Sequence, residues 1–123
     1  MERNSLRELT NFYFKRNKNN CLDYDYKINR NQKFDIIITK NNNNPEGKNT
    51  KIGVFICDIH RSIGLNVLRK IQCMLEDSEE INNAILVGKD FSSQVRKFRK
   101  SYNDVKLLSQ AEIKRNIESK WDY

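Results

Sequence analysis

The N-terminal part of the chain carries the apolar spacing of an amphipathic helix. Leu6 and Leu9 would share one face of a helix, and Ser5 with Glu8 has the S-x-x-E form of a capping box. The stretch 16–20 is wholly polar. We therefore expect a helix that begins at Ser5 and ends in this polar stretch.

Three strand-like patterns follow this helix. Apolar and polar residues alternate over 22–28, which predicts a strand with one buried face. The run 34–39 is nearly all apolar and β-branched, and a third apolar run covers 52–59, so both are expected to be more deeply buried strands. The Asn-rich segment at about 40–51, which includes Pro45, is expected to be a polar loop.

Helices and strands alternate over the second half of the chain. The expected elements are a helix over 65–75, a strand over 84–88, a helix over 91–102, a strand over 105–108 and a helix opened by a second capping box, Ser109-Gln110-Ala111-Glu112. Asp90 or Ser92 is expected to cap the second of these helices. The order α-β-β-β-α-β-α-β-α predicts an α/β domain, because strands joined through helices imply crossover connections and a mixed sheet flanked by helices.

Length and charge limit the classes of protein to consider. The 123 residues suffice for a single domain, 1–123, with one core. The formal net charge of +7 favours an acidic partner, of which nucleic acid is the commonest. A basic protein with no such partner is the simpler alternative.

The spacing of the cysteines and the length of the apolar runs argue against a zinc site and against a membrane-spanning segment. Cys21, Cys57 and Cys73 are widely spaced, with no C-x-x-C pair, so a zinc site is not expected. Free thiols indicate an intracellular, reducing compartment. No signal peptide or apolar run of about 18 residues is evident, and there is no Gly-rich phosphate loop. We therefore expect no membrane association and no small-molecule cofactor.

The expected helix over 91–102 is the best candidate for contact with a partner. Four of the five residues 96–100 are cations, which cannot all face a core, so Val95 and Phe98 are expected to point inward. Such a surface would neutralise several phosphates and give a steep salt dependence without reading sequence. The alternatives are a solvated basic face and a docking surface for an acidic protein. The predicted nucleic-acid-binding residues are Lys89, Arg96, Lys97, Arg99, Lys100 and Lys106; a second basic group near the N-terminus comprises Arg7, Lys15, Arg16 and Lys18.

Several sequence blocks add a family resemblance to this picture. They are Cys57-Asp58 followed by Ser62-Ile63-Gly64-Leu65, then Ala84-Ile85-Leu86-Val87, Phe91-Ser92-Ser93, and Ala111-Glu112 with Asn116-Ile117. Together with the three consecutive strands they resemble the restriction-endonuclease-like core. The closest resemblance is to the N-terminal jaw domain of the shared fifth-largest subunit of eukaryotic RNA polymerases, which has this fold without nuclease activity, and the second is to the Mrr-like endonucleases. The polymerase subunit carries a second, C-terminal domain that has no counterpart in these 123 residues.

The resemblance to nucleases also places catalytic positions on the chain. When the family's helix-start glycine is set on Gly64, Asp35 matches the first catalytic acid, whereas Phe55 and Cys57 stand where an acid (or Gln) and a Lys are needed. Residues two apart share one face of a strand, where they would meet one metal ion and one attacking water. A Phe cannot bind a hard cation, and a Cys cannot replace an ammonium. The resemblance therefore implies a pseudo-nuclease with no catalytic or metal-binding residues, in which Asp35 is a relic or pairs with a Lys or Arg at the edge of the strand.

A shift of register leaves an enzymatic alternative open. Asp58 and His60 also stand two residues apart, so Asp35 and Asp58 would bind Mg²⁺ or Mn²⁺ while His60 acts as the base. The simpler alternative places Asp58 and His60 in an exposed junction after the strand. Outside this nuclease alternative, no cofactor is expected.

These residues and resemblances predict a non-catalytic domain that associates with nucleic acid, duplex DNA in particular, or serves as an assembly subunit in transcription. A metal-dependent DNA nuclease of the Mrr-like type is one alternative. A structural scaffold subunit of a larger complex, with no nucleic-acid contact, is the other. The compartment would be nuclear if the resemblance to the polymerase subunit holds.

Overall fold

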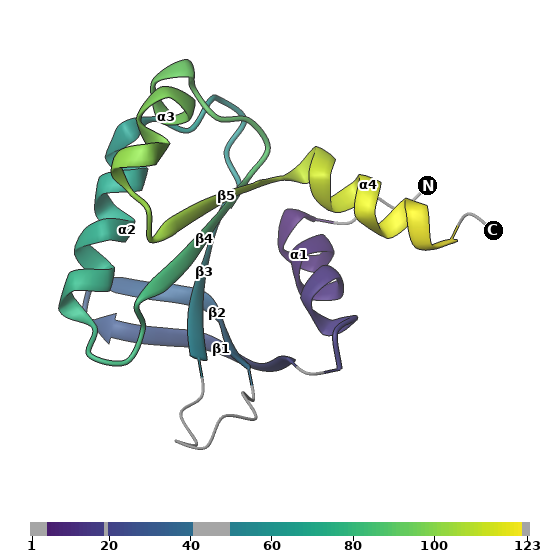
Figure 1. The fold of residues 1–123 in the computed structure, drawn as a ribbon, viewed down its shortest axis with the longest axis horizontal. Helices are drawn as coiled ribbons and strands as arrows, with labels where there is room; N and C mark the ends of the chain where they lie inside the picture. Colours follow the sequence, from purple (N-terminus) through teal and green to yellow (C-terminus); the bar gives the residue numbers. More distant parts are fainter. Residues whose placement is uncertain (1–4, 19, 41–49, 122–123) are drawn as a thin grey trace.

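A computed structural model describes residues 5–18, 20–40 and 50–121, with side chains as far as residue 117. A five-stranded sheet with the order β1-β2-β3-β4-β5 lies between helices on its two faces (Figure 1). The predicted α/β class with a mixed sheet flanked by helices is therefore confirmed. Among the described helices, none has the length and apolar content needed to cross a bilayer.

The elements follow the predicted order. They are α1 (Leu6–Lys15), β1 (Asn20–Asn29), β2 (Gln32–Lys40), β3 (Thr50–Cys57), α2 (Leu65–Asp77), β4 (Asn83–Gly88), α3 (Ser93–Phe98), the 3-10 helix η1 (Arg99–Ser101), β5 (Val105–Ser109) and α4 (Gln110–Trp121). The predicted helix over 91–102 is divided into α3 and η1. The expected loop over 40–51 is wrong at both ends, because β2 includes Lys40 and β3 begins at Thr50. The Asn-rich segment 41–49 lies outside the described residues.

The sheet combines both kinds of strand pairing. β1, β2 and β3 pair antiparallel, whereas β3 with β4 and β4 with β5 pair parallel. Each parallel connection passes through helix, α2 in the first case and α3 with η1 in the second, as crossovers require. β1 and β5 therefore form the two edges of the sheet.

The two faces of the sheet bury separate apolar clusters. α2 and α3 cover one face, where Phe34, Leu68 and Leu86 are fully buried (Figure 1). α1 and α4 cover the other face, where Leu6 and Val54 are buried. We call these the α2 cluster and the α1 cluster. Burial of each such side chain contributes about 1.5–3 kcal/mol, which is how the sheet holds helices on both faces.

The side chains of β2 change face near Asp35. Phe34 lies in the α2 cluster, whereas Ile36, two residues further on, lies in the α1 cluster. On β1, Asp25 stands opposite this point and has a positive φ of 53°. The hairpin therefore twists sharply here. The ring of Phe34 consequently covers Gly53 of β3, where a Cβ would lie 2.8 Å from the ring carbons.

Local capping holds the helix starts. The hydroxyl oxygens of Ser5 and Ser109 accept the amide hydrogens three residues further on, each at 3.1 Å, so the Ser contact of both predicted capping boxes is confirmed. Ser92 rather than Asp90 caps α3, because its hydroxyl oxygen accepts the amide hydrogen of Val95.

Candidate functional site

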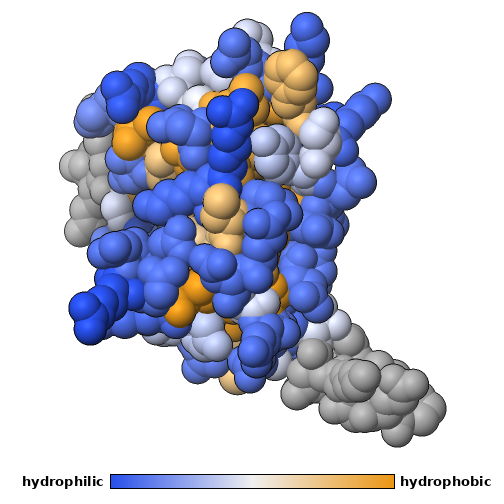
Figure 2. Space-filling view, turned by 90° about the vertical axis from the view of Figure 1, so that its left-hand side faces the viewer, coloured by the Kyte–Doolittle hydropathy of each residue, from blue (hydrophilic) through white to orange (hydrophobic). Residues whose placement is uncertain are grey.

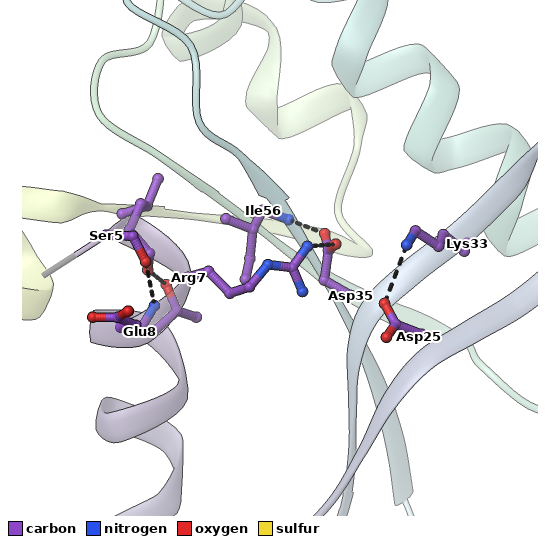
Figure 3. Close-up of polar contacts among 9 residues, drawn as sticks. Ser5, Arg7, Glu8, Asp25, Lys33, Asp35 and Ile56 are labelled. Carbon is purple, nitrogen blue, oxygen red and sulfur yellow. Dashed lines mark hydrogen bonds and ion pairs between the residues drawn. The ribbon is translucent and has the colours of Figure 1, made fainter.

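Asp35 is held by two donors from distant parts of the chain (Figure 3). Its Oδ1 accepts a hydrogen bond from Arg7 Nη2 of α1 at 2.7 Å, and its Oδ2 accepts one from the Ile56 amide of β3 at 2.7 Å. The paired residues of β2 and β3 end at Ile36 and Val54. Beyond this pair, the Asp35 carboxylate accepts the Ile56 amide hydrogen of β3. Asp35 is only 6% exposed. This carboxylate therefore joins α1, β2 and β3.

The Arg7 guanidinium occupies one oxygen of the Asp35 carboxylate, Oδ1. A guanidinium is a permanent cation with donors only, so it satisfies the carboxylate but cannot ligate a metal. The Arg7 side chain is 54% exposed, whereas that of Asp35 is 9% exposed. A metal ion at Asp35 would have to compete with this pair.

Phe55 and Cys57 stand on β3 at the positions that the resemblance assigned to catalytic residues. Both contact the α2 cluster, and Lys70 of α2 lies over the Phe55 ring, 5.4 Å from its centroid. Burial raises the pKa of the Cys57 thiol above its ordinary value, and the Lys70 ammonium opposes this shift. Asp35, in contrast, takes its cationic partner from α1 on the opposite face of the sheet. These two β3 side chains thus belong to the core under α2.

Asp58 and His60 do not lie on a strand. β3 ends at Cys57, two residues before the expected end, so both lie exposed in the connection to α2. Asp58 Oδ1 pairs with Lys89 Nζ at 3.0 Å. Within residues 5–18, 20–40 and 50–117, no group of three His, Cys, Asp or Glu side chains is placed to hold a metal ion. Asp35, Asp58 and His60 are therefore not gathered around one position.

The predicted nucleic-acid-binding residues gather mainly around α3 and η1. Arg99 and Lys100 of η1 and Lys106 of β5 line one hollow of about 340 Å³ at the edge of the sheet. We call Arg96, Lys97, Arg99, Lys100 and Lys106 the basic surface. All five side chains are exposed, and in the described part of the chain none is ion-paired with a carboxylate. This surface can therefore accept an anionic partner.

One prediction about this region needs correction, and one of the predicted cations has an acidic partner. Phe98, expected to point inward beside Val95, is 43% exposed, because α3 gives way to the tighter η1 at this residue. The Lys97 ammonium lies 5.7 Å from the centroid of the Phe98 ring. Lys89 differs from the other predicted cations, because its charge is already paired with Asp58.

A hollow that no sequence motif predicted lies at the C-terminal end of α1. It has a volume of about 550 Å³, and Ile38, Ile52 and Ile85 of three neighbouring strands line it. The cations in its lining are Arg16, Lys18 and Lys40. The sequence contained one indication of this hollow, the second basic group near the N-terminus, because that group includes Arg16 and Lys18. The contribution of Lys40 and the apolar lining became evident only when β2, β3 and β4 lay side by side.

The acidic residues after α2 form a polar contact with the sheet. Glu80 Oε2 lies 3.0 Å from Lys51 Nζ and accepts a hydrogen bond from the Tyr26 hydroxyl at 3.2 Å. Lys51 lowers the pKa of Glu80, and Glu80 in turn raises the pKa of Lys51. Burial, and then Glu80, raise the pKa of Tyr26. Because every member has a partner, this cluster ties the end of α2 to β1 and β3.

No protein-family profile matches the chain, and neither a curated protein nor a solved structure matches it. The fold defines an α/β domain with a five-stranded mixed sheet flanked by helices. A function has to be argued from the residues of the chain itself.

Proposed function

We propose that this chain is a non-catalytic nucleic-acid-binding domain with a restriction-endonuclease-like core, which contacts the phosphates of duplex DNA through the basic surface. The observation that carries the proposal is the hollow shared by Arg99, Lys100 and Lys106, whose cations have no carboxylate partner in the described residues. Each phosphate that such a cation neutralises releases condensed counterions, which drives binding. A role as a subunit of a transcription assembly follows from the resemblance to the polymerase jaw domain.

The character of the α2 and α3 face supports a polar partner. Seen from that side, the described residues are mostly hydrophilic, with small separate apolar spots (Figure 2). Stable contacts between proteins usually bury a broader apolar centre. A highly charged phosphate backbone, in contrast, needs exposed cations and no apolar patch.

Two features support the remaining parts of the proposal. The antiparallel pairing of β1, β2 and β3, followed by parallel β4, is what the resemblance to the restriction-endonuclease-like core leads one to expect. The ion pair of Asp35 with Arg7 supports a structural role for the one acid that matches a catalytic position.

Binding to labelled duplex DNA at several salt concentrations tests the proposal. We expect log K to fall steeply with log salt, with a slope of about −0.9 for each phosphate neutralised. Replacing Arg99, Lys100 and Lys106 together by Gln should therefore make the slope shallower by about 2 to 3. The matched control replaces Lys114 and Arg115, two exposed cations of α4, by Gln. Equal effects of the two variants would refute the basic surface as the binding site.

The same preparations separate the alternatives. Cleavage of DNA with Mg²⁺ or Mn²⁺, lost in Asp35→Ala, would support the nuclease and refute a non-catalytic role. Failure to bind duplex DNA, or weak and salt-independent binding that is unaffected by the triple Gln variant, would refute the proposal. Co-purification of protein partners with the chain would then favour the scaffold alternative.

A further inference from the structure

The hollow at the end of α1 has the size of a small-ligand site, and its lining combines polar side chains with the side chains of three isoleucines. Its volume of about 550 Å³ lies within the roughly 300–1,000 Å³ range of such sites. Ile38 is buried, but Ile52 and Ile85 are only partly covered, although they point from central strands toward the α1 side. These two side chains therefore offer apolar contact to whatever enters the hollow.

A second hollow continues from the first toward the edge of the sheet. It has a volume of about 290 Å³ and shares Lys40, Ile52 and Ile85 with the first. Its lining adds Lys106 of β5, together with Asp104. The two hollows thus form one groove across β3 and β4, with cations along it.

Among the described residues, the cations of the first hollow have no carboxylate partner. Within the described part of the chain, the acceptors of Arg16 are neutral: it donates to the carbonyls of Tyr13 at 3.4 Å and Asn116 at 3.1 Å, and it lies 5.0 Å from the centroid of the Tyr13 ring. Lys18 and Lys40 are exposed, and in the described residues neither is ion-paired. Of the described residues that line this hollow, none is an Asp or a Glu. Its charge therefore favours an anionic ligand.

Asn20 adds a requirement for a hydrogen-bond donor. Its Nδ2 donates to the Phe14 carbonyl at 3.1 Å, which fixes the orientation of the amide, because a carbonyl can only accept. The other amide atom, Oδ1, is buried without a donor among the described residues. A buried acceptor of this kind ordinarily marks the place of a water, ion or ligand group. The N–H or O–H group of a base or sugar would satisfy this acceptor, whereas a phosphomonoester dianion has no such group to donate.

We infer that this cavity binds a nucleotide, meaning a phosphate joined to a sugar and a flat base. Arg16, Lys18 and Lys40 would receive the phosphate, and the base would lie on Ile52 and Ile85. A base amine or sugar hydroxyl would donate to Asn20 Oδ1. The site is distinct from the basic surface of the proposed function, and Lys106 is the one residue that the basic surface and the groove share. A free nucleotide and the end of a nucleic-acid strand offer the same chemistry.

Calorimetric titration with AMP, adenosine and inorganic phosphate tests the inference. We expect AMP to bind at least about tenfold more tightly than adenosine or phosphate, because only AMP meets both the cations and the apolar side chains. Lys40→Gln should weaken AMP binding by about tenfold, since it removes a charge-assisted contact. The matched control is Lys27→Gln, another exposed strand lysine, which lies on β1 and should leave AMP binding unchanged.

A steric variant and a strand-end ligand complete the test. Ile52→Trp would fill the cavity and abolish AMP binding while leaving the weak binding of phosphate. If Ile52→Trp does not fold, Lys40→Gln still tests the site, because Lys40 is at an exposed position. Equal binding of AMP and a 5′-phosphorylated oligonucleotide would identify a free nucleotide as the ligand, and much tighter binding of the oligonucleotide would identify a strand end. Equal binding of AMP, adenosine and phosphate, or equal effects of Lys40→Gln and Lys27→Gln, would overturn the inference. Because Lys100→Gln should weaken duplex binding but not AMP binding, failure of one site can be told from failure of the other.

Discussion

Asp35→Ala is the substitution that most directly separates a structural carboxylate from a catalytic one. It leaves the Ile56 amide without its acceptor, which costs about 1–3 kcal/mol for a group removed from water. It also removes the ion pair with Arg7, which contributes at most about 1 kcal/mol because the Arg7 side chain is half exposed. We therefore expect a loss of about 1–4 kcal/mol in the free energy of unfolding.

Asp35→Asn separates these two contributions. The amide oxygen of Asn can still accept from the Ile56 amide, but the charge that attracts Arg7 is gone. We expect this variant to lose only about 1 kcal/mol. Arg7→Met, combined with each variant in a double-mutant cycle, should show coupling with Asp35→Asn of similar size.

Urea unfolding followed by circular dichroism measures these differences. With a slope of about 2 kcal/mol per molar urea, Asp35→Ala should lower the midpoint by about 0.5–2 M and Asp35→Asn by at most about 0.5 M. The slope itself should not change, because the surface exposed on unfolding is the same.

The opposite pattern would refute this reasoning. A carboxylate retained for metal binding and catalysis is often unfavourable for stability, so its removal leaves the protein as stable or more stable. In that case Asp35→Ala would not lower the midpoint. Mg²⁺ would also stabilise the unsubstituted protein and not the variant, since a ligand that binds only the folded state raises its stability.

Three further predictions concern other parts of the fold. Gly53→Ala places a methyl group against a buried ring and should cost about 1–3 kcal/mol in thermal unfolding, whereas Gly64→Ala, whose nearest contact is 3.1 Å from a flexible side chain, should cost less than about 1 kcal/mol. Iodoacetamide should modify Cys57 more slowly than the two exposed cysteines, because Cys57 is half-buried and its raised pKa favours the unreactive thiol form. Equal rates of modification in peptide mapping would contradict this prediction. Glu80→Gln should be less stable than the unsubstituted protein near neutral pH. Because the pKa of Glu80 is lowered in the folded state, the difference in stability should disappear as the pH falls below the ordinary Glu value of 4.5. It should also disappear as the pH rises through the raised pKa of Lys51. A difference in stability that does not depend on pH would exclude the ion pair as its cause.

Local pattern was sufficient for much of the fold. Ser5 and Ser109 were recognised as caps because a capping box is made by residues three apart, which no tertiary contact has to bring together. Period-two and apolar runs identified the strands because burial of one or both faces shapes composition along a strand. The same reasoning failed at Phe98, where a change from α-helix to 3-10 helix turned an apolar side chain outward.

The candidate sites could be predicted from the sequence only in part. The cations of 96–100 were visible in the sequence because they are neighbours along the chain. Their association with Lys106 depends on the position of β5 at the edge of the sheet, and the pairing of Lys89 with Asp58 depends on two separate connections meeting. A charge pattern shows how many cations are available, but not which of them are already neutralised.

The sequence by itself determined which segments become helices and strands, because hydrophobic period and capping are properties of neighbouring residues. Only the tertiary structure decided that Arg7 meets Asp35 and that Arg16, Lys18 and Lys40 surround one hollow. These contacts join residues far apart in the chain. Their geometry depends on how the sheet twists and on where α1 ends over it, which no local pattern specifies.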